Sequence, residues 1–143
     1  MAPRTILVVD DEPQIRGLIR NVLERENYRV LEAEDGEEAL TLCERSDANV
    51  SLLLTDIVMP NLDGIELARR IRALKPDIRV IYMSGKCEIA MVERDLRQLG
   101  FGFIKKPFAL PALLGSVREA LGTGRKTPAK SESSAAAGDT RTA

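Results

Sequence analysis

The chain has 143 residues, enough for one domain with a buried core, and a net charge of −1 from 21 basic and 22 acidic residues. A mildly acidic balance with 3% aromatic residues argues against a nucleic-acid-binding surface, and the absence of histidine excludes histidine catalysis, metal ligation and phosphohistidine within the chain. No apolar run approaches membrane-spanning length and no signal peptide is visible. Two cysteines without metal-ligand spacing favour a reducing, cytoplasmic compartment.

Strand-like and helix-like segments alternate from the first apolar run onward. Residues 5–9 predict a strand, since residues 6–9 are continuously apolar, and a helix over 13–26 follows it. Next come an alternating strand over 28–33 and a helix over 36–45, whose inner face carries Cys43 as a predicted core residue. The first helix has one apolar face at helical period, made of Ile15, Leu18, Ile19, Val22 and Leu23.

The second half of the chain repeats this alternation. A strand over 50–55 precedes a helix over 65–74 whose predicted inward residues are Leu67, Ala68, Ile71 and Leu74. A strand over 79–83 precedes a fourth helix with an apolar stripe of Ile89, Val92, Leu96 and Leu99. A short strand over 103–105 and a fifth helix over 110–121 complete the series.

This alternation predicts an α/β fold with a doubly wound, five-stranded parallel sheet and five helices. The first, third and fourth strands are apolar throughout, as buried parallel strands are, whereas the second and fifth are mixed or short and suit the edges. The pattern fits the known flavodoxin-like order 2-1-3-4-5, which is the order we expect here, with ligands at the carboxyl ends of the strands. Residues 1–122 form the predicted domain. Residues 123–143 lack apolar periodicity and are predicted to be a disordered, low-complexity tail.

Polar side chains with related chemistry stand where the predicted strands end. Asp10 and Asp11 follow the first strand, Asp56 the third, Ser84 the fourth and Lys106 the fifth. The three carboxylates would repel one another unless a cation lay between them, and Mg²⁺ prefers such oxygen ligands, with Mn²⁺ as the alternative. A central carboxylate beside an ammonium and a hydroxyl suits attack on a phosphoryl group to form an acyl phosphate.

These residues lie in motifs that resemble the response-regulator receiver domain of bacterial two-component signalling. The resemblance covers residues 5–122 and rests on five sequence motifs in matching order: VVDDE (8–12), LTDIVMP (54–60), DG (63–64), MSG (83–85) and KPF (106–108). It implies that Asp56 is the phosphoacceptor, and that Lys106 binds the phosphoryl group. Ser84 and Phe103 would be the switch residues, and Val58 and Lys86 would tune the phosphoryl lifetime. The implied metal ligands are Asp10, Asp11, Asp56 and the Val58 backbone carbonyl.

The resemblance also implies how such a module works. A separate histidine kinase or phosphotransfer protein supplies the phosphoryl group. Phosphorylation then changes an interaction surface of the fourth helix, fifth strand and fifth helix, toward an unknown output protein. The chain catalyses only its own phosphorylation and dephosphorylation, so it is not expected to be an enzyme, nor to bind nucleic acid or membrane. Homodimerisation on phosphorylation stays open.

Other interpretations remain at this point. Aspartates after strands also cap helices, Ser84 suits a turn, and Phe103 suits a core. A phosphorelay intermediate or phosphate sink working with a hybrid histidine kinase is an alternative role. A flavodoxin-like FMN domain is disfavoured by acids where a phosphate loop would lie. An aspartyl-phosphate hydrolase would need a second acid two residues after its nucleophile, and Val58 stands at that position after Asp56.

Overall fold

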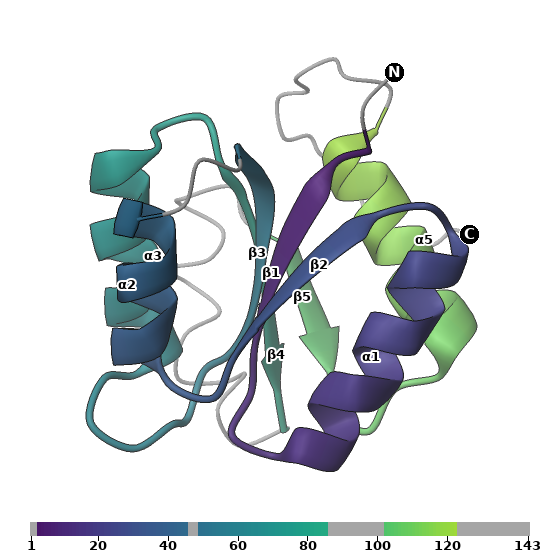
Figure 1. Ribbon diagram of the computed structural model, residues 1–143. Coiled ribbons are helices and arrows are strands. Elements are labelled where there is room, and N and C mark those ends of the chain that lie inside the picture. Colours follow the sequence, from purple (N-terminus) through teal and green to yellow (C-terminus); the bar gives the residue numbers. More distant parts are fainter. Residues whose placement is uncertain (1–2, 46–48, 86–101, 123–143) are drawn as a thin grey trace.

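The computed structural model describes residues 3–45, 49–85 and 102–122, and Figure 1 shows their arrangement. The fourth predicted helix, Lys86 and the predicted tail lie outside the described residues. In chain order the elements are β1 (Thr5–Val9), α1 (Pro13–Arg25), β2 (Arg29–Ala33), α2 (Gly36–Arg45), β3 (Val50–Asp56), α3 (Gly64–Leu74), β4 (Arg79–Ser84), β5 (Gly102–Lys105) and α5 (Leu110–Leu121).

The five strands form one parallel sheet in the order β2-β1-β3-β4-β5, so the predicted topology is confirmed. Helices α1 and α5 cover one face of the sheet, and α2 and α3 cover the other (Figure 1). Connections between parallel strands must cross over a face of the sheet, and right-handed crossovers that run in opposite directions across the sheet lie on opposite faces, as α1 from β1 to β2 and α2 from β2 to β3 do (Figure 1). The doubly wound architecture follows from this change of direction.

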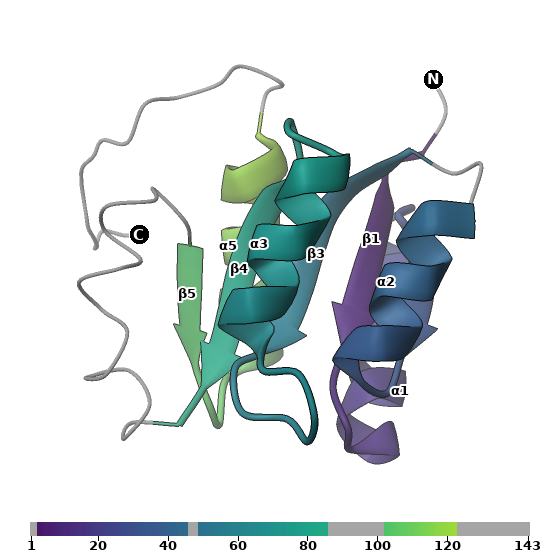
Figure 2. The ribbon, with the colours of Figure 1, turned by 90° about the vertical axis from the view of Figure 1, so that its left-hand side faces the viewer.

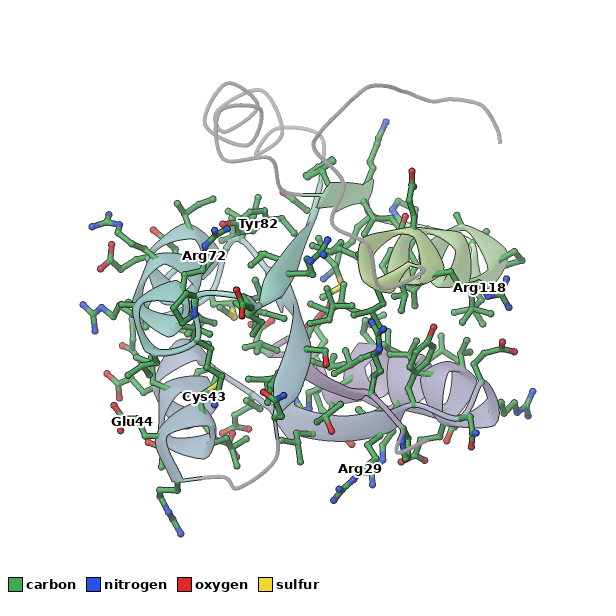
Figure 3. The ribbon with its side chains drawn as sticks, turned by 90° about the horizontal axis from the view of Figure 1, so that it is seen from above. Arg29, Cys43, Glu44, Arg72, Tyr82 and Arg118 are labelled. Carbon is green, nitrogen blue, oxygen red and sulfur yellow. The ribbon has the colours of Figure 1, made fainter. Side chains whose placement is uncertain are left out.

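Two apolar clusters, one on each side of the sheet, form the core. Successive side chains of a strand point to opposite faces, so Ile6 and Val8 pack on the side of α1 and α5, and Leu7 and Val9 on the side of α2 and α3. Cys43 is buried in the second cluster, as predicted, and Figure 3 shows it directed from α2 toward the sheet. Burial raises the pKa of its thiol, which keeps it in the neutral form.

Two predicted inward residues are exposed instead. Leu18 is 47% exposed and Leu74 is 48% exposed. The apolar stripe of α1 is wider than the surface that the sheet covers, so Ile19 and Leu23 fill the core while Leu18 lies at its flank. Leu74 is the last residue of α3, and no further turn of that helix covers it.

Several boundaries differ from the predictions by one residue. The strands β3 and β4 include Asp56 and Ser84 as their last residues, and α3 begins at Gly64. Tyr28 belongs to a turn and not to β2, because its N–H donates to the Leu23 carbonyl of α1 after Asn27 takes a left-handed φ of 72°. These shifts leave the predicted ends of the strands at one edge of the sheet.

That edge carries the residues of interest. Figure 2 shows the arrowheads of β1, β3, β4 and β5 ending along the same side of the sheet, where α1, α3 and α5 begin. A parallel sheet brings all its carboxyl ends to one side, and side chains just beyond them become neighbours. Within residues 3–45, 49–85 and 102–122, no helix has the length and apolar character needed to cross a membrane.

Candidate functional site

Four charged residues from three different strand ends meet at this edge. Asp10 and Asp11 follow β1, Asp56 ends β3, and Lys106 follows β5. One carboxylate oxygen from each of the three aspartates lies within 4.8 Å of the others. Separations of up to 96 positions in the chain therefore become contacts at one site.

Lys106 is the positive centre of the cluster. Its Nζ donates to Asp10 Oδ2 at 2.9 Å and to Asp56 Oδ2 at 3.1 Å, and lies 3.8 Å from Glu12 Oε1. Burial lowers the Lys106 pKa, but the hydrogen bond to Asp10 and the charges of Asp56 and Asp10 outweigh this and raise it overall. The ammonium therefore stays charged and holds two strands' carboxylates together.

Asp56 lies at the centre of the site and is 9% exposed. Burial raises the pKa of Asp56 to about 6. Lys106 opposes that rise, and the charges of Asp10 and Asp11 add to it. A carboxylate held at this cost gains from any further positive charge placed beside it. The Asp56 backbone is fixed as well, since Ile57 N–H donates to the Met83 carbonyl of β4 at 3.1 Å.

Asp10 has no exposed surface, and hydrogen bonds occupy every polar group it has. Its N–H donates to the Ala33 carbonyl at 3.2 Å, and its carbonyl accepts from Arg16 Nη1 at 2.7 Å. Its Oδ1 accepts from the Glu12 N–H at 2.9 Å, while Oδ2 accepts from Lys106. Asp10 is therefore a rigid wall of the site, in contrast to the exposed Asp11.

The donor set fits a hard divalent cation. Three carboxylates face one ammonium, so the cluster carries excess negative charge, and oxygen is the ligand type that Mg²⁺ selects. The exposed Asp11 leaves a side open toward solvent, as a cation that keeps several waters requires. Asp10, Asp11 and Asp56 are the residues that would hold it.

The other predicted residues lie around this cluster. Ser84 is 1% exposed and its hydroxyl donates to the Gly85 carbonyl at 3.2 Å, while its own carbonyl accepts from Lys106 N–H at 2.7 Å. Val58, two residues beyond Asp56, exposes 58% of its surface. Phe103 is partly buried on β5 and packs against the cluster on the α2 and α3 side. The Lys106–Pro107 peptide bond is cis.

Two residues that support the site, Gly64 and Arg16, were given no role in it by the sequence analysis. Gly64 lies so close to β3 that a Cβ there would overlap the Asp56 carbonyl oxygen, and its N–H donates to Ile57 O at 2.8 Å. Its neighbour Asp63 caps α3 by accepting from Glu66 N–H at 2.8 Å. The sequence DG before a helix predicts a cap, but nothing in that pattern predicts that Gly64 lies against the Asp56 carbonyl. No sequence pattern predicted the role of Arg16, whose guanidinium donates to the Asp10 carbonyl.

Comparison with known proteins gives consistent matches. Residues 6–118 match the model of the response regulator receiver domain family. The sensor kinase CckA of Brucella abortus is 40% identical over 118 residues, which are 82% of this chain and 12% of that protein. The response regulator receiver protein CpdR of the same organism is 32% identical over 118 residues, which are 82% of this chain and 97% of that protein.

A solved structure agrees with the fold. The response regulator protein TrrA of Thermotoga maritima, in complex with Mg²⁺–BeF, superposes with a TM-score of 0.70 at 34% identity, covering 82% of this chain and 99% of that one. The chain thus spans a small part of some relatives and nearly the whole of others. On this fold and these matches, the chain belongs to the response regulator receiver domain family of two-component signalling.

Proposed function

We propose that this chain is a phosphoacceptor module in which Asp56 receives a phosphoryl group from a partner protein in the presence of Mg²⁺. The observation that carries the proposal is the contact of Lys106 Nζ with both Asp56 and Asp10 inside a cluster of three carboxylates. Charge of both signs at one strand edge suits a phosphoryl group on one carboxylate and a cation between the others. The Mg²⁺–BeF complex of the relative TrrA supports the same assignment.

The transfer forms one bond and breaks one. An Asp56 carboxylate oxygen attacks phosphorus, the bond from phosphorus to the donor breaks, and the donor leaves with its electron pair. Lys106 stabilises negative charge on the transferred oxygens, and bound Mg²⁺ supplies further charge neutralisation there. The proposed ligands are Asp10, Asp11, Asp56 and the Val58 carbonyl. Because Lys106 is anchored by buried Asp10, its ammonium needs little reorganisation at the moment of transfer.

The proposed output is a changed interaction surface. Ser84 lies on β4 and Phe103 on β5, and β4 is the one strand that separates Asp56 on β3 from β5. Movement of Ser84 toward that group would let Phe103 reorient and alter the surface of β5 and α5, with the fourth predicted helix. Unchanged amide spectra over the described residues of β5 and α5 on phosphorylation would contradict this.

The phosphoryl donor is proposed to be a histidine kinase or a phosphotransfer protein, because the chain has no histidine of its own. A role as phosphorelay intermediate or phosphate sink is a second candidate, supported by the likeness to part of the sensor kinase CckA. Return of the phosphoryl group from Asp56 to a phosphotransfer histidine would separate the two roles. The output protein, homodimerisation and a cytoplasmic location stay predictions.

A direct experiment tests the phosphoacceptor. The wild-type protein is incubated with acetyl phosphate and Mg²⁺, and its intact mass is measured beside Asp56→Asn and the control Asp63→Asn. A phosphoryl adduct is expected on the wild type and on Asp63→Asn, which changes an aspartate outside the cluster. No adduct is expected on Asp56→Asn, or on the wild type with EDTA in place of Mg²⁺. An adduct of equal yield on Asp56→Asn would refute the assignment.

A further inference from the structure

An ion-pair network of three charged side chains connects the site with α1 and β2. It consists of Arg16 and Arg20 on α1 and Glu32 on β2. Arg16 Nε lies 3.0 Å from Glu32 Oε1, and Arg20 Nη1 lies 2.7 Å from Glu32 Oε2. Both oxygens of Glu32 are therefore occupied, each by a different arginine.

Arg16 is the member of this ion-pair network that reaches the site. While its Nε binds Glu32, its Nη1 donates to the Asp10 carbonyl at 2.7 Å. Its side chain is only 16% exposed, and its ion pair with Glu32 holds it in place. A guanidinium suits this task because it presents several N–H groups in one rigid plane.

The Asp10 carbonyl depends on that contact. Asp10 is fully buried and lies one residue beyond β1, and among the described contacts its carbonyl accepts from Arg16 and from no backbone N–H. A buried carbonyl without a donor costs about 1–3 kcal/mol, so without Arg16 the peptide unit would turn toward another partner. That peptide unit joins the Cα atoms of Asp10 and Asp11, so the same turn would move two of the three carboxylates of the cluster.

We propose that Arg16, held by Glu32, is a positioning residue for the cation site. It fixes the main chain at Asp10 and so keeps the carboxylates of Asp10 and Asp11 in register with Asp56. This inference rests on the proposed function, because it assigns Arg16 a role toward the divalent cation that the cluster would bind. Partners behind metal ligands typically change metal affinity by about 10–100-fold when they are removed.

Electrostatics and positioning predict opposite signs for the key variant. Arg16→Gln removes a positive charge near the carboxylates, and Coulomb attraction alone then predicts tighter Mg²⁺ binding. Loss of positioning predicts weaker binding. Arg20→Gln is the matched control. It also removes one positive charge from α1 and one ion pair from Glu32, but Arg20 has no hydrogen bond to Asp10 among the contacts described.

The experiment is a calorimetric titration of the unphosphorylated full chain with Mg²⁺, repeated with Mn²⁺. We expect Arg16→Gln to raise the Kd about tenfold, and Arg20→Gln to leave it unchanged or slightly lower. Arg16→Lys keeps the charge, but its donors all lie on one nitrogen and cannot reproduce the two separate contacts of the guanidinium. A higher Kd is therefore expected for this variant too. Denaturant unfolding without metal identifies the folded variants, and the Kd is compared among those.

Each result distinguishes the two ideas. A Kd for both Arg16 variants at or below the wild-type value would overturn the positioning role while leaving the phosphoacceptor proposal intact. An equal loss of cation affinity in Arg16→Gln and Arg20→Gln would also overturn it, since a merely structural role of the ion-pair network predicts that outcome. A wild-type chain that binds neither cation would instead contradict the proposed function itself.

Discussion

Lys106 Nζ lies 3.1 Å from Asp56 Oδ2, although 50 positions separate the two residues in the chain. The same ammonium lies 2.9 Å from Asp10 Oδ2, so one side chain joins the ends of β1 and β3 from beyond β5. The contact has a structural role of its own. Without Lys106, the fully buried Asp10 carboxylate would accept no hydrogen bond from a cation among the described residues, since Arg16 bonds to the Asp10 carbonyl instead.

Lys106→Met is therefore expected to lower the free energy of unfolding by about 3 kcal/mol at pH 7, because breaking a buried ion pair leaves an uncompensated charge. Urea denaturation measures the change. Lys105→Met, on the preceding and exposed residue of β5, is the control and should change stability by less than about 0.5 kcal/mol. Equal stabilities for the two variants would show that Asp10 does not depend on Lys106.

Asp56→Asn is expected to stabilise the metal-free protein at neutral pH. The folded pKa of about 6 lies above the ordinary value of 3.8, so folding disfavours the charged form. The destabilisation by wild-type Asp56 is therefore absent below about pH 4, grows as the pH rises, and is complete above about pH 6. The gain is expected to be on the order of 2 kcal/mol at pH 7 and close to zero at pH 4.

Denaturant unfolding of both proteins in EDTA at several pH values measures this gain. Asp77→Asn, at an exposed position, serves as the control. A gain that is the same at pH 4 and pH 7 would mean that the charge of Asp56 is not its cause. Millimolar Mg²⁺ should raise the wild-type melting temperature, because it binds the folded state, and should do so less for Asp56→Asn.

Two glycine substitutions are expected to act in opposite directions. A Cβ at Gly64 would overlap the Asp56 carbonyl oxygen, whereas a Cβ at Gly115 in α5 meets no heavy atom within 4 Å among its described neighbours. Gly64→Ala should destabilise by about 2 kcal/mol or more, since backbone must move. Gly115→Ala should stabilise by about 0.5–1 kcal/mol through the higher helix propensity of alanine. Thermal unfolding of both variants checks the signs, and a neutral Gly64→Ala would contradict the close approach.

Val58→Asn is expected to shorten the lifetime of the phosphorylated form. Val58 is 58% exposed, so the change leaves the core intact, and an amide two residues from Asp56 offers a hydrogen bond to an attacking water that valine lacks. The decay of the phosphoryl adduct after removal of donor gives the rate. Leu74→Asn, at a comparably exposed position at the far end of α3, should decay like the wild type. An unchanged rate in Val58→Asn would refute the tuning role.

Local patterns determined most of the fold. Continuous apolar runs mark β1, β3 and β4 as buried strands because both faces of a parallel sheet are covered, and the mixed or short character of β2 and β5 suited the edges. The order itself came from the match to the known flavodoxin-like arrangement. Placing Asp10, Asp56 and Lys106 at one edge needed only that the strands are parallel, since the carboxyl ends of parallel strands coincide. Helix boundaries were predictable to one or two residues for the same local reason.

What the sequence by itself determined is therefore which residues share an edge of the sheet, because the limits and side-chain period of each strand are local properties and parallel strands all end at one edge. Only the tertiary structure decided which of them touch. The bond of Lys106 to both Asp10 and Asp56, the exposure of Leu18, and the reach of Arg16 to the Asp10 carbonyl depend on how helices pack on the sheet. Such contacts join distant parts of the chain, and no local pattern encodes their distances.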